Sequence, residues 1–318
     1  MKPAAATPDG SLPPLDRRAW RQIAVITLAA VAIFAGFRWL PTGTNLSHMD
    51  FRATGGNSIE FCDPLNPQFI PVVAVKSPVT MTLAPGAPLV PGRELPFTLT
   101  LRTASGKPIA PEDLLVAHTR KLHLLIVDPW LNDYHHVHPE PGARPGDWTF
   151  AFTPKREGVY RVFADFTPVV TARGLYASAD VRIGNSGLPG VYTVVLRHEP
   201  SWVVEQDGYR FALVPGSLPV RARLPVDLRL SVTRTDGGRV PLAPVMGAFA
   251  HLVAFDEARS GFAHLHPVET DLSQLPDAVK PVLNFKITIP QPGSYVIWAQ
   301  LNTGGREVFV PFWFDVEA

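Results

Sequence analysis

The stretch His123-Leu-Leu-Ile-Val-Asp128, a short turn, and Tyr134-His-His136-Val-His138-Pro139 decides the fold of this chain because it occurs twice. Shifted by 128 positions (123 to 251, 136 to 264), it returns as His251-Leu-Val-Ala-Phe-Asp256 and Phe262-Ala-His264-Leu-His266-Pro267. Three histidines, an aspartate and a proline keep their spacing without a gap. Such a match indicates an internal duplication, in which the chain holds two copies of one domain.

Around both copies, short β-branched and aromatic runs alternate with turns that contain Pro and Gly, and this pattern predicts strands. The first copy predicts strands at residues 80–83, 96–102, 121–127, 134–138, 148–152, 159–166 and 176–183. The second copy predicts strands at residues 192–197, 209–213, 227–233, 249–255, 262–266, 283–289, 295–301 and 307–314. We therefore expect an all-β fold with two tandem antiparallel β-sandwich domains, at residues 71–184 and 190–318.

A Gly-x-Tyr sequence opens a late strand in each copy, at Gly158-Val-Tyr160 and Gly293-Ser-Tyr295. A tyrosine at this place often forms a corner in immunoglobulin-like sandwiches, so we expect both tyrosines to be structural.

The N-terminal region predicts a membrane segment. Arg17, Arg18 and Arg21 precede an apolar run at residues 23–37. Basic residues on the N-terminal side favour a cytoplasmic tail, residues 1–21, and a transmembrane signal-anchor at residues 22–40. A cleaved signal peptide is the alternative. After a linker at residues 41–70, both domains would lie outside the cytoplasmic membrane, in the periplasm or the extracellular space.

Composition excludes some classes of function. The formal net charge is +1, which gives no electrostatic footprint for nucleic acid. Cys62 is the single cysteine of the sequence, so an intramolecular disulfide cannot form and packing must stabilise the domains. The sequence contains no nucleophile elbow, phosphate-binding loop or dinucleotide fingerprint, and we expect a protein that is not an enzyme.

The repeated histidines carry the chemistry. Side chains alternate along a strand, so His136 and His138 share one face, as do His264 and His266. If His123 and His251 pair with positions in the following strand, each hairpin brings three imidazoles to one face, close enough for one metal ion. A slip of one residue in register would break the set. Three neutral imidazoles suit Cu(II), Zn(II) or Ni(II).

Other polar residues near the hairpins have weaker signals. His118 and Met246 stand five residues before His123 and His251, and either could add a fourth ligand. Asp128 and Asp256 follow the first strand and favour turn capping over metal binding. His135 has Ala263 as its counterpart and should point to the opposite face.

The hairpin motif followed by Gly-x-Tyr resembles the YtkA-like group of bacterial cell-envelope domains, over residues 120–183 and 248–316. The resemblance implies exported cupredoxin- or immunoglobulin-like sandwiches associated with heavy-metal or copper handling. It implies a site at His123, His136 and His138 and another at His251, His264 and His266. The Cys and Met pattern of a blue-copper electron-transfer site is absent from this sequence.

Together these observations predict a membrane-anchored protein that binds a copper or zinc ion in each domain and sequesters it, passes it on or supports assembly of an envelope metalloenzyme. Its partners would be the cytoplasmic membrane, through the N-terminal helix, and an envelope protein. The alternative is a pair of interaction modules that dock an envelope partner and whose histidines are structural.

Overall fold

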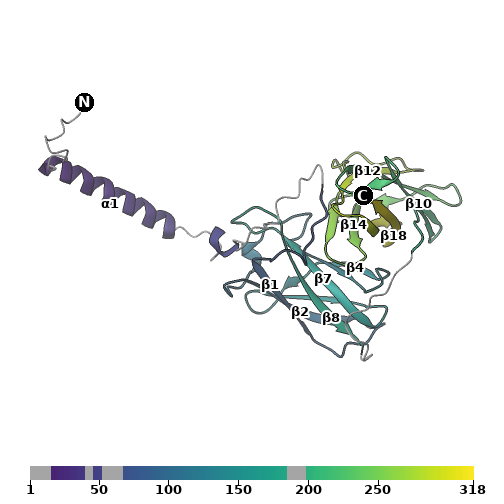
Figure 1. The fold of residues 1–318 in the computed structure, drawn as a ribbon, viewed down its shortest axis with the longest axis horizontal. Coiled ribbons are helices and arrows are strands. Elements are labelled where there is room, and N and C mark those ends of the chain that lie inside the picture. The colour runs from purple at the N-terminus through teal and green to yellow at the C-terminus, as the bar shows by residue number, and fades with distance from the viewer. Residues whose placement is uncertain (1–15, 40–45, 52–66, 185–197) are drawn as a thin grey trace. The chain divides into compact units, whose positions relative to one another are not determined.

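The computed structural model describes residues 16–39, 46–51, 67–184 and 198–318 and separates the chain into two compact units, Met1–Asn45 and Leu46–Ala318. The first unit contains helix α1 (Arg17–Trp39; Figure 1). Its first turn is capped by Asp16, whose Oδ1 accepts a hydrogen bond from the Ala19 amide at 2.6 Å. By length and composition, α1 can cross a membrane over Arg17–Gly36. The predicted membrane segment lies on this helix. The side on which the domains lie stays a prediction.

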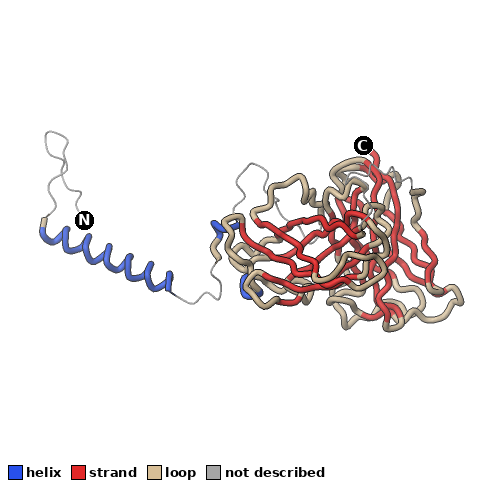
Figure 2. The backbone as a smooth tube through the Cα atoms, turned by 90° about the horizontal axis from the view of Figure 1, so that it is seen from below, coloured by secondary structure: helices blue, strands red, loops and turns tan. Residues whose placement is uncertain are grey.

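The second unit is built from strands and loops, with two short 3-10 helices, η1 (His48–Phe51) and η2 (Pro111–Asp113), among its described residues (Figure 2). Its first sandwich has one sheet in the order β1 (Val79–Pro85), β2 (Leu95–Thr103), β6 (Asp147–Phe152), β5 (Glu140–Pro141). The facing sheet has the order β4 (Tyr134–Val137), β3 (Leu122–Val127), β7 (Gly158–Phe166), β8 (Leu175–Ile183).

The second sandwich repeats this plan. One sheet has the order β16 (Val282–Thr288), β12 (Pro225–Arg234), β10 (Tyr209–Pro215), β9 (Val203–Gln206). The other has the order β11 (Val220–Arg221), β18 (Arg306–Glu317), β17 (Gly293–Thr303), β14 (Ala250–Asp256), β15 (Phe262–Leu265), and β13 (Leu242–Ala243) also pairs with β17. The expected all-β fold of two tandem antiparallel sandwiches behind an N-terminal apolar helix is confirmed.

Most predicted strands have a counterpart within a few residues. The predicted strand at 192–197, Cys62 and the boundary near residue 190 lie outside the described residues. Strand β9 was missed, although Asp207-Gly208 between it and β10 is a two-residue hairpin signal, and both residues have positive φ (52° and 77°). The segment after residue 66, predicted as linker, pairs with the second sandwich, because Ile70 bridges Phe262 and Gln68 bridges Thr288.

Each sandwich encloses its own apolar core. Leu99, Leu124 and Trp148 lie in the first, whereas Leu230, Leu252 and Phe312 lie in the second. Residues next to the inward ones on β3, such as Leu125 and Val127, are also fully buried. Strand β3 is therefore covered on both of its faces.

A third apolar core covers these outer faces. It joins residues of β3, β4 and β7 to residues of β14, β15, β17 and β18. Its contacts are reciprocal between the repeats. Tyr134 lies 5.7 Å from Trp298, and the equivalent pair, Phe262 and Phe163, lies 5.4 Å apart between ring centroids. The two sandwiches thus meet through the sheets that carry the histidine hairpins.

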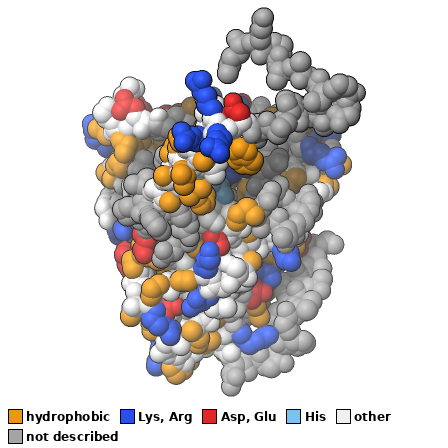
Figure 3. All heavy atoms as spheres, turned by 90° about the vertical axis from the view of Figure 1, so that its left-hand side faces the viewer, with side chains coloured by type: hydrophobic (Ala, Val, Ile, Leu, Met, Phe, Trp, Pro, Cys, Tyr) orange, Lys and Arg blue, Asp and Glu red, His pale blue; other side chains and the backbone are white. Residues whose placement is uncertain are grey.

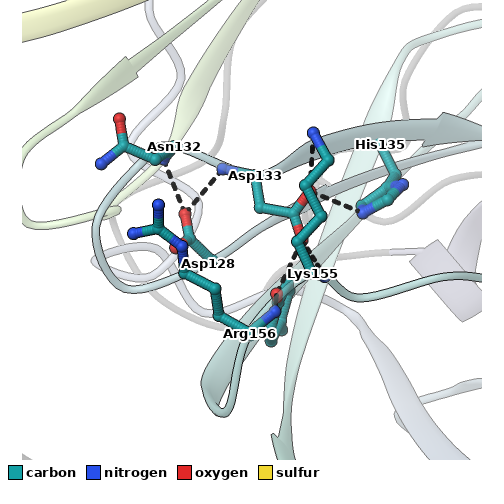
Figure 4. Close-up of polar contacts among 7 residues, drawn as sticks. Asp128, Asn132, Asp133, His135, Lys155 and Arg156 are labelled. Atoms are coloured by element: carbon teal, nitrogen blue, oxygen red, sulfur yellow. Dashed lines mark hydrogen bonds and ion pairs between the residues drawn. The ribbon is translucent and has the colours of Figure 1, made fainter. Parts of the chain in front are cut away.

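The turn of the first hairpin is organised by two buried carboxylates (Figure 4). Asp128 Oδ1 accepts hydrogen bonds from the amides of Asn132 (2.7 Å) and Asp133 (3.0 Å), which confirms its capping role. Asp133 accepts from the Lys155 amide (2.7 Å) and the Tyr160 hydroxyl (2.7 Å) and lies 3.1 Å from His135 Nε2. Burial acts to raise the pKa of Asp133, but its contacts with His135, Lys155 and Tyr160 outweigh burial and lower this pKa to about 2.

Tyr160→Phe is expected to destabilise the first sandwich by about 1–3 kcal/mol, because the hydroxyl donates to buried Asp133 and accepts from the Arg156 amide. Urea unfolding measures the change. The matched control is Tyr295→Phe, whose hydroxyl donates to the Gln291 carbonyl (3.0 Å) and leaves no buried charge behind. Its expected cost is smaller, about 1 kcal/mol. Equal costs for both variants would contradict the role assigned to Asp133.

Candidate metal centre

Hairpin register brings the predicted histidines together. In the first hairpin Leu124 pairs with Val137, and Leu125 with His136. The same register, continued by one residue, sets His123 opposite His138, on the outer face of the sheet. The second hairpin pairs Leu252 with Leu265 and thus sets His251 opposite His266. The one-residue slip that would separate the imidazoles does not occur.

Each set of three histidines could hold a metal ion. We call His123, His136 and His138 the first triad and His251, His264 and His266 the second triad. Within each triad, one nitrogen from every ring lies within 4.8 Å of the other two. His123 Nδ1 lies 3.2 Å from His136 Nε2 in the first triad. His251 Nδ1 lies 3.4 Å from His264 Nε2 in the second.

The distal nitrogens show which ring atoms carry protons. His123 Nε2 lies 2.9 Å from the Ala117 carbonyl oxygen, and His251 Nε2 lies 3.0 Å from that of Val245. A carbonyl only accepts hydrogen bonds, so both Nε2 atoms are protonated. A neutral imidazole has one N–H. The Nδ1 atom of each ring therefore directs a lone pair into its triad.

The same reasoning applies to His136 and His264. His136 Nδ1 lies 2.8 Å from Gln300 Oε1, and the Gln300 amide nitrogen donates to Glu307 at 2.8 Å, which fixes the amide orientation. His264 Nδ1 lies 3.3 Å from Asp165 Oδ2. Both Nδ1 atoms donate to oxygen, so both Nε2 atoms also direct lone pairs into the triads.

In each triad, then, two lone pairs face each other at 3.2 or 3.4 Å with no proton between them. Two nitrogens at 2.0–2.1 Å from one tetrahedral ion are separated by about 3.3–3.4 Å. The third ring, His138 or His266, contributes one nitrogen to each set, and its Nε2 atom is buried and has no hydrogen-bond partner among the described residues. A cation is the group that satisfies all three nitrogens at once.

Burial keeps the six imidazoles neutral. It lowers the pKa of every triad histidine, to about 4 for His251 and about 3 for His138, and it lowers those of His136, His264 and His266 well below the usual range. Neighbouring imidazoles lower most of these values further. Neutral histidine is the form that binds a metal ion, so protons compete little with metal at neutral pH.

Three residues next to the triads were missed from the sequence: Asp165, Gln300 and Glu307. Asp165 pairs with His123 across β3 and β7, and Gln300 pairs with His251 across β14 and β17. Asp165 and Gln300 thus occupy equivalent places in the two repeats. Because their side chains differ in type, comparison of the two copies gives no signal for them.

His118 and Met246 occupy equivalent tight turns. Each has φ of 48° and is followed by a second residue with positive φ, and the turns are closed by the bridges Ala117–Arg120 and Val245–Ala248. The His118 ring stacks on His266 of the other sandwich, with centroids 3.6 Å apart. The sequence suggested His118 as a ligand beside His123, but its nearest ring belongs to the second triad.

Two further sequence predictions concern residues outside the triads. His135 points away from the first triad, since it pairs with Asp133 and packs against Phe152. Asp256 accepts from the Ser260 amide at 2.7 Å and so caps its turn, as Asp128 does. Among the described residues, both aspartates accept hydrogen bonds from backbone amides of their own turns and neither bonds a triad histidine.

Comparison with protein families decides the relationship of the chain. A family model described as Domain of unknown function (DUF8832) matches residues 74–181 and 203–318. The chain belongs to the DUF8832 family. Each DUF8832 region contains one complete triad, so the family match follows the duplication. The match is to DUF8832, and the link to the YtkA-like group stays a prediction.

Other comparisons add little to the DUF8832 assignment. No curated protein matches the chain. A crystal structure of a protein described as membrane-anchored from Corynebacterium diphtheriae is 7% identical with a TM-score of 0.25, and the match covers 75% of this chain and 59% of that one. An E. coli alpha-2-macroglobulin structure is 12% identical with a TM-score of 0.22, and the match covers 75% of this chain and 17% of that one. The chain thus spans less than two thirds of either protein.

On the face drawn in Figure 3, the described basic and acidic side chains are interspersed with apolar ones, and histidine is scarcely visible. This view agrees with the burial of His123, His136 and His251.

Proposed function

We propose that this chain is a membrane-anchored protein that binds one transition-metal ion, copper or zinc, at each histidine triad outside the cytoplasmic membrane, and that it holds the ion or passes it on. The observation that carries the proposal is the pair of lone pairs facing each other in each triad, at 3.2 Å and 3.4 Å. Buried lone pairs so close repel each other unless a cation lies between them.

The ligand set fits metal holding without catalysis. Three protein nitrogens leave a tetrahedral ion with one open position, through which it can be received or released. A hydrolytic centre would also need a general base beside the open position. Asp165, the carboxylate nearest the triads, is held by His264 instead. We therefore propose a metal carrier or store that is not an enzyme.

The test is titration of the full chain in detergent micelles with Cu(II), Cu(I) and Zn(II), followed by calorimetry. We expect about two bound equivalents and a melting temperature that rises with metal. The sharpest variant is His138→Ala, because His138 Nε2 has no protein partner to lose. We expect this variant to lower the metal affinity of the first triad by more than about 100-fold while the metal-free protein melts as before.

His135→Ala is the matched control, since this ring lies on the same hairpin but points to the other face. It should keep both metal equivalents although it removes the contact between His135 and Asp133. If the wild type binds no metal beyond the level of a histidine-free control protein, the proposal is wrong. If His138→Ala lowers the melting temperature of the metal-free protein and leaves affinity unchanged, the histidines are structural, as in a docking module.

A further inference from the structure

The two triads face each other where the sandwiches meet. Ring centroids of His136 and His264 are 5.3 Å apart, those of His123 and His264 are 5.8 Å apart, and those of His136 and His251 are 6.2 Å apart. Separations within a triad are 4.7–5.5 Å. Rings that belong to different triads are thus almost as close to each other as rings of the same triad.

Hydrogen bonds that orient the ligands cross between the repeats. Asp165, on β7 of the first sandwich, holds His264 of the second triad at 3.3 Å. Gln300, on β17 of the second sandwich, holds His136 of the first triad at 2.8 Å. Each sandwich therefore sets the tautomer and ring orientation of a ligand that belongs to the other. Such partners of ligating histidines strongly affect metal affinity.

We propose that the two triads form one dinuclear metal centre, in which each sandwich supplies the ligands of one ion and orients a ligand of the other. This inference rests on the proposed function and deepens it. The sequence placed one independent site in each domain. The structure brings both into a single cluster of six histidines, with the exposed His118 stacked against it as a seventh.

The two positions of this centre are unequal. The second triad has the carboxylate of Asp165 behind His264, whereas the first has the neutral amide of Gln300 behind His136. A carboxylate makes its imidazole a stronger donor to a divalent ion and offsets part of the ionic charge. The second triad also has His118 stacked on His266. The second position therefore binds a divalent ion first.

Electron paramagnetic resonance of the full chain loaded with Cu(II) tests the dinuclear arrangement. The first equivalent should give an isolated Cu(II) spectrum. The second should broaden the spectrum and leave its intensity below twice the first, because the neighbouring spins couple. His138→Ala and His266→Ala, each loaded with one equivalent, supply the isolated reference spectra of the second and first positions.

Asp165→Asn tests the orientation across the repeats. In the His138→Ala background only the second position remains, and there the variant should lower Cu(II) affinity about 10- to 100-fold. In the His266→Ala background only the first position remains, and affinity should fall by much less, because Asp165 lies beside His123 but orients no ligand of that triad. Asp180→Asn is the control, because Asp180 lies on the same sheet but pairs with Arg161.

The possible outcomes separate failure of the dinuclear centre from failure of metal binding itself. Two bound ions with additive, unbroadened spectra, or a single bound ion, would overturn the dinuclear centre and leave metal binding by the triads intact. Equal loss of affinity in both Asp165→Asn backgrounds would overturn the crossed orientation. Absence of Cu(II) binding in the wild type would sink the proposed function and this inference together.

Discussion

The metal-free protein is expected to lose stability steeply as pH falls from about 6.5 to about 5, and bound metal is expected to prevent this loss. Burial lowers the pKa of every triad histidine and of His118 in the folded state. An unfolded histidine titrates near 6.5. Below that pH the unfolded chain binds more protons than the folded one, so acidification favours unfolding.

His251 shows how much stability one buried histidine costs at low pH. It is fully buried, and its pKa in the folded state is about 4. At pH 5 this difference alone costs about 2 kcal/mol of stability. The other triad histidines act in the same direction, as does the charge of Arg120 near His123 and His138, whereas Asp165 favours the imidazolium form. The total is a large fraction of the 5–15 kcal/mol that stabilises ordinary domains.

Urea unfolding of the metal-free chain at several pH values measures this effect. The loss from Asp133, with a pKa of about 2, begins only below about pH 4 and so lies outside the window from about 6.5 to about 5. Burial raises the pKa of Asp128, Asp165 and Asp256, so protonation of these carboxyls in the folded state offsets part of the histidine loss. The double variant His136→Asn, His264→Asn lacks two of the histidines whose pKa is lowered in the folded state. Its free energy of unfolding should therefore fall less steeply as the pH decreases. Stability that stays constant across the window would contradict the burial of neutral histidines.

Gly261→Ala is expected to destabilise the protein by about 2–4 kcal/mol. A Cβ atom at this position would lie 2.7 Å from the carbonyl carbon of Ile70 and 2.8 Å from Cα of Pro71. These atoms belong to backbone, which cannot move aside as a flexible side chain can. The residues next to Gly261 hold that backbone, through Ile70–Phe262 hydrogen bonds of 2.8 and 3.1 Å and a Val73–Ser260 bond of 2.8 Å.

The control is Gly216→Ala. Its φ also lies outside the positive region, and its nearest neighbour would be the Asp227 carbonyl oxygen at 3.4 Å, an ordinary contact. This change should alter stability by less than about 1 kcal/mol. Thermal and urea unfolding compare the two variants. Equal stability would mean that the segment before β1 moves aside without cost and is not fixed to the second hairpin.

The sequence predicted the fold and the triads because both depend on local rules applied twice. Alternation along a strand places His136 and His138 on one face, and the duplication shows that both hairpins share one register. Which face of the sheet carries the histidines depends on contacts between distant segments. The uninterrupted apolar runs at residues 124–127 and 252–255 were the available sign, since strands buried on both faces lack polar alternation.

The residues that orient the histidine ligands could not be predicted from the sequence, for a different reason. Asp165 lies 99 residues and Gln300 164 residues from the histidine on which it acts, in a strand that belongs to the other repeat. Their side chains differ, so comparison of the two copies hides them. Tertiary contact between the sandwiches alone brings them to His264 and His136.

The reciprocal contacts between the sandwiches have a consequence for the history of the chain. Asp165 of the first repeat contacts His264 of the second. Their equivalents, Gln300 of the second repeat and His136 of the first, contact each other in the same way. Two identical subunits related by a twofold axis make contacts of this kind. The chain has the interface of a homodimer whose subunits are covalently joined. Once both copies lie in one chain, their sequences can diverge. One copy then carries Asp165 and His118 where the other carries Gln300 and Met246.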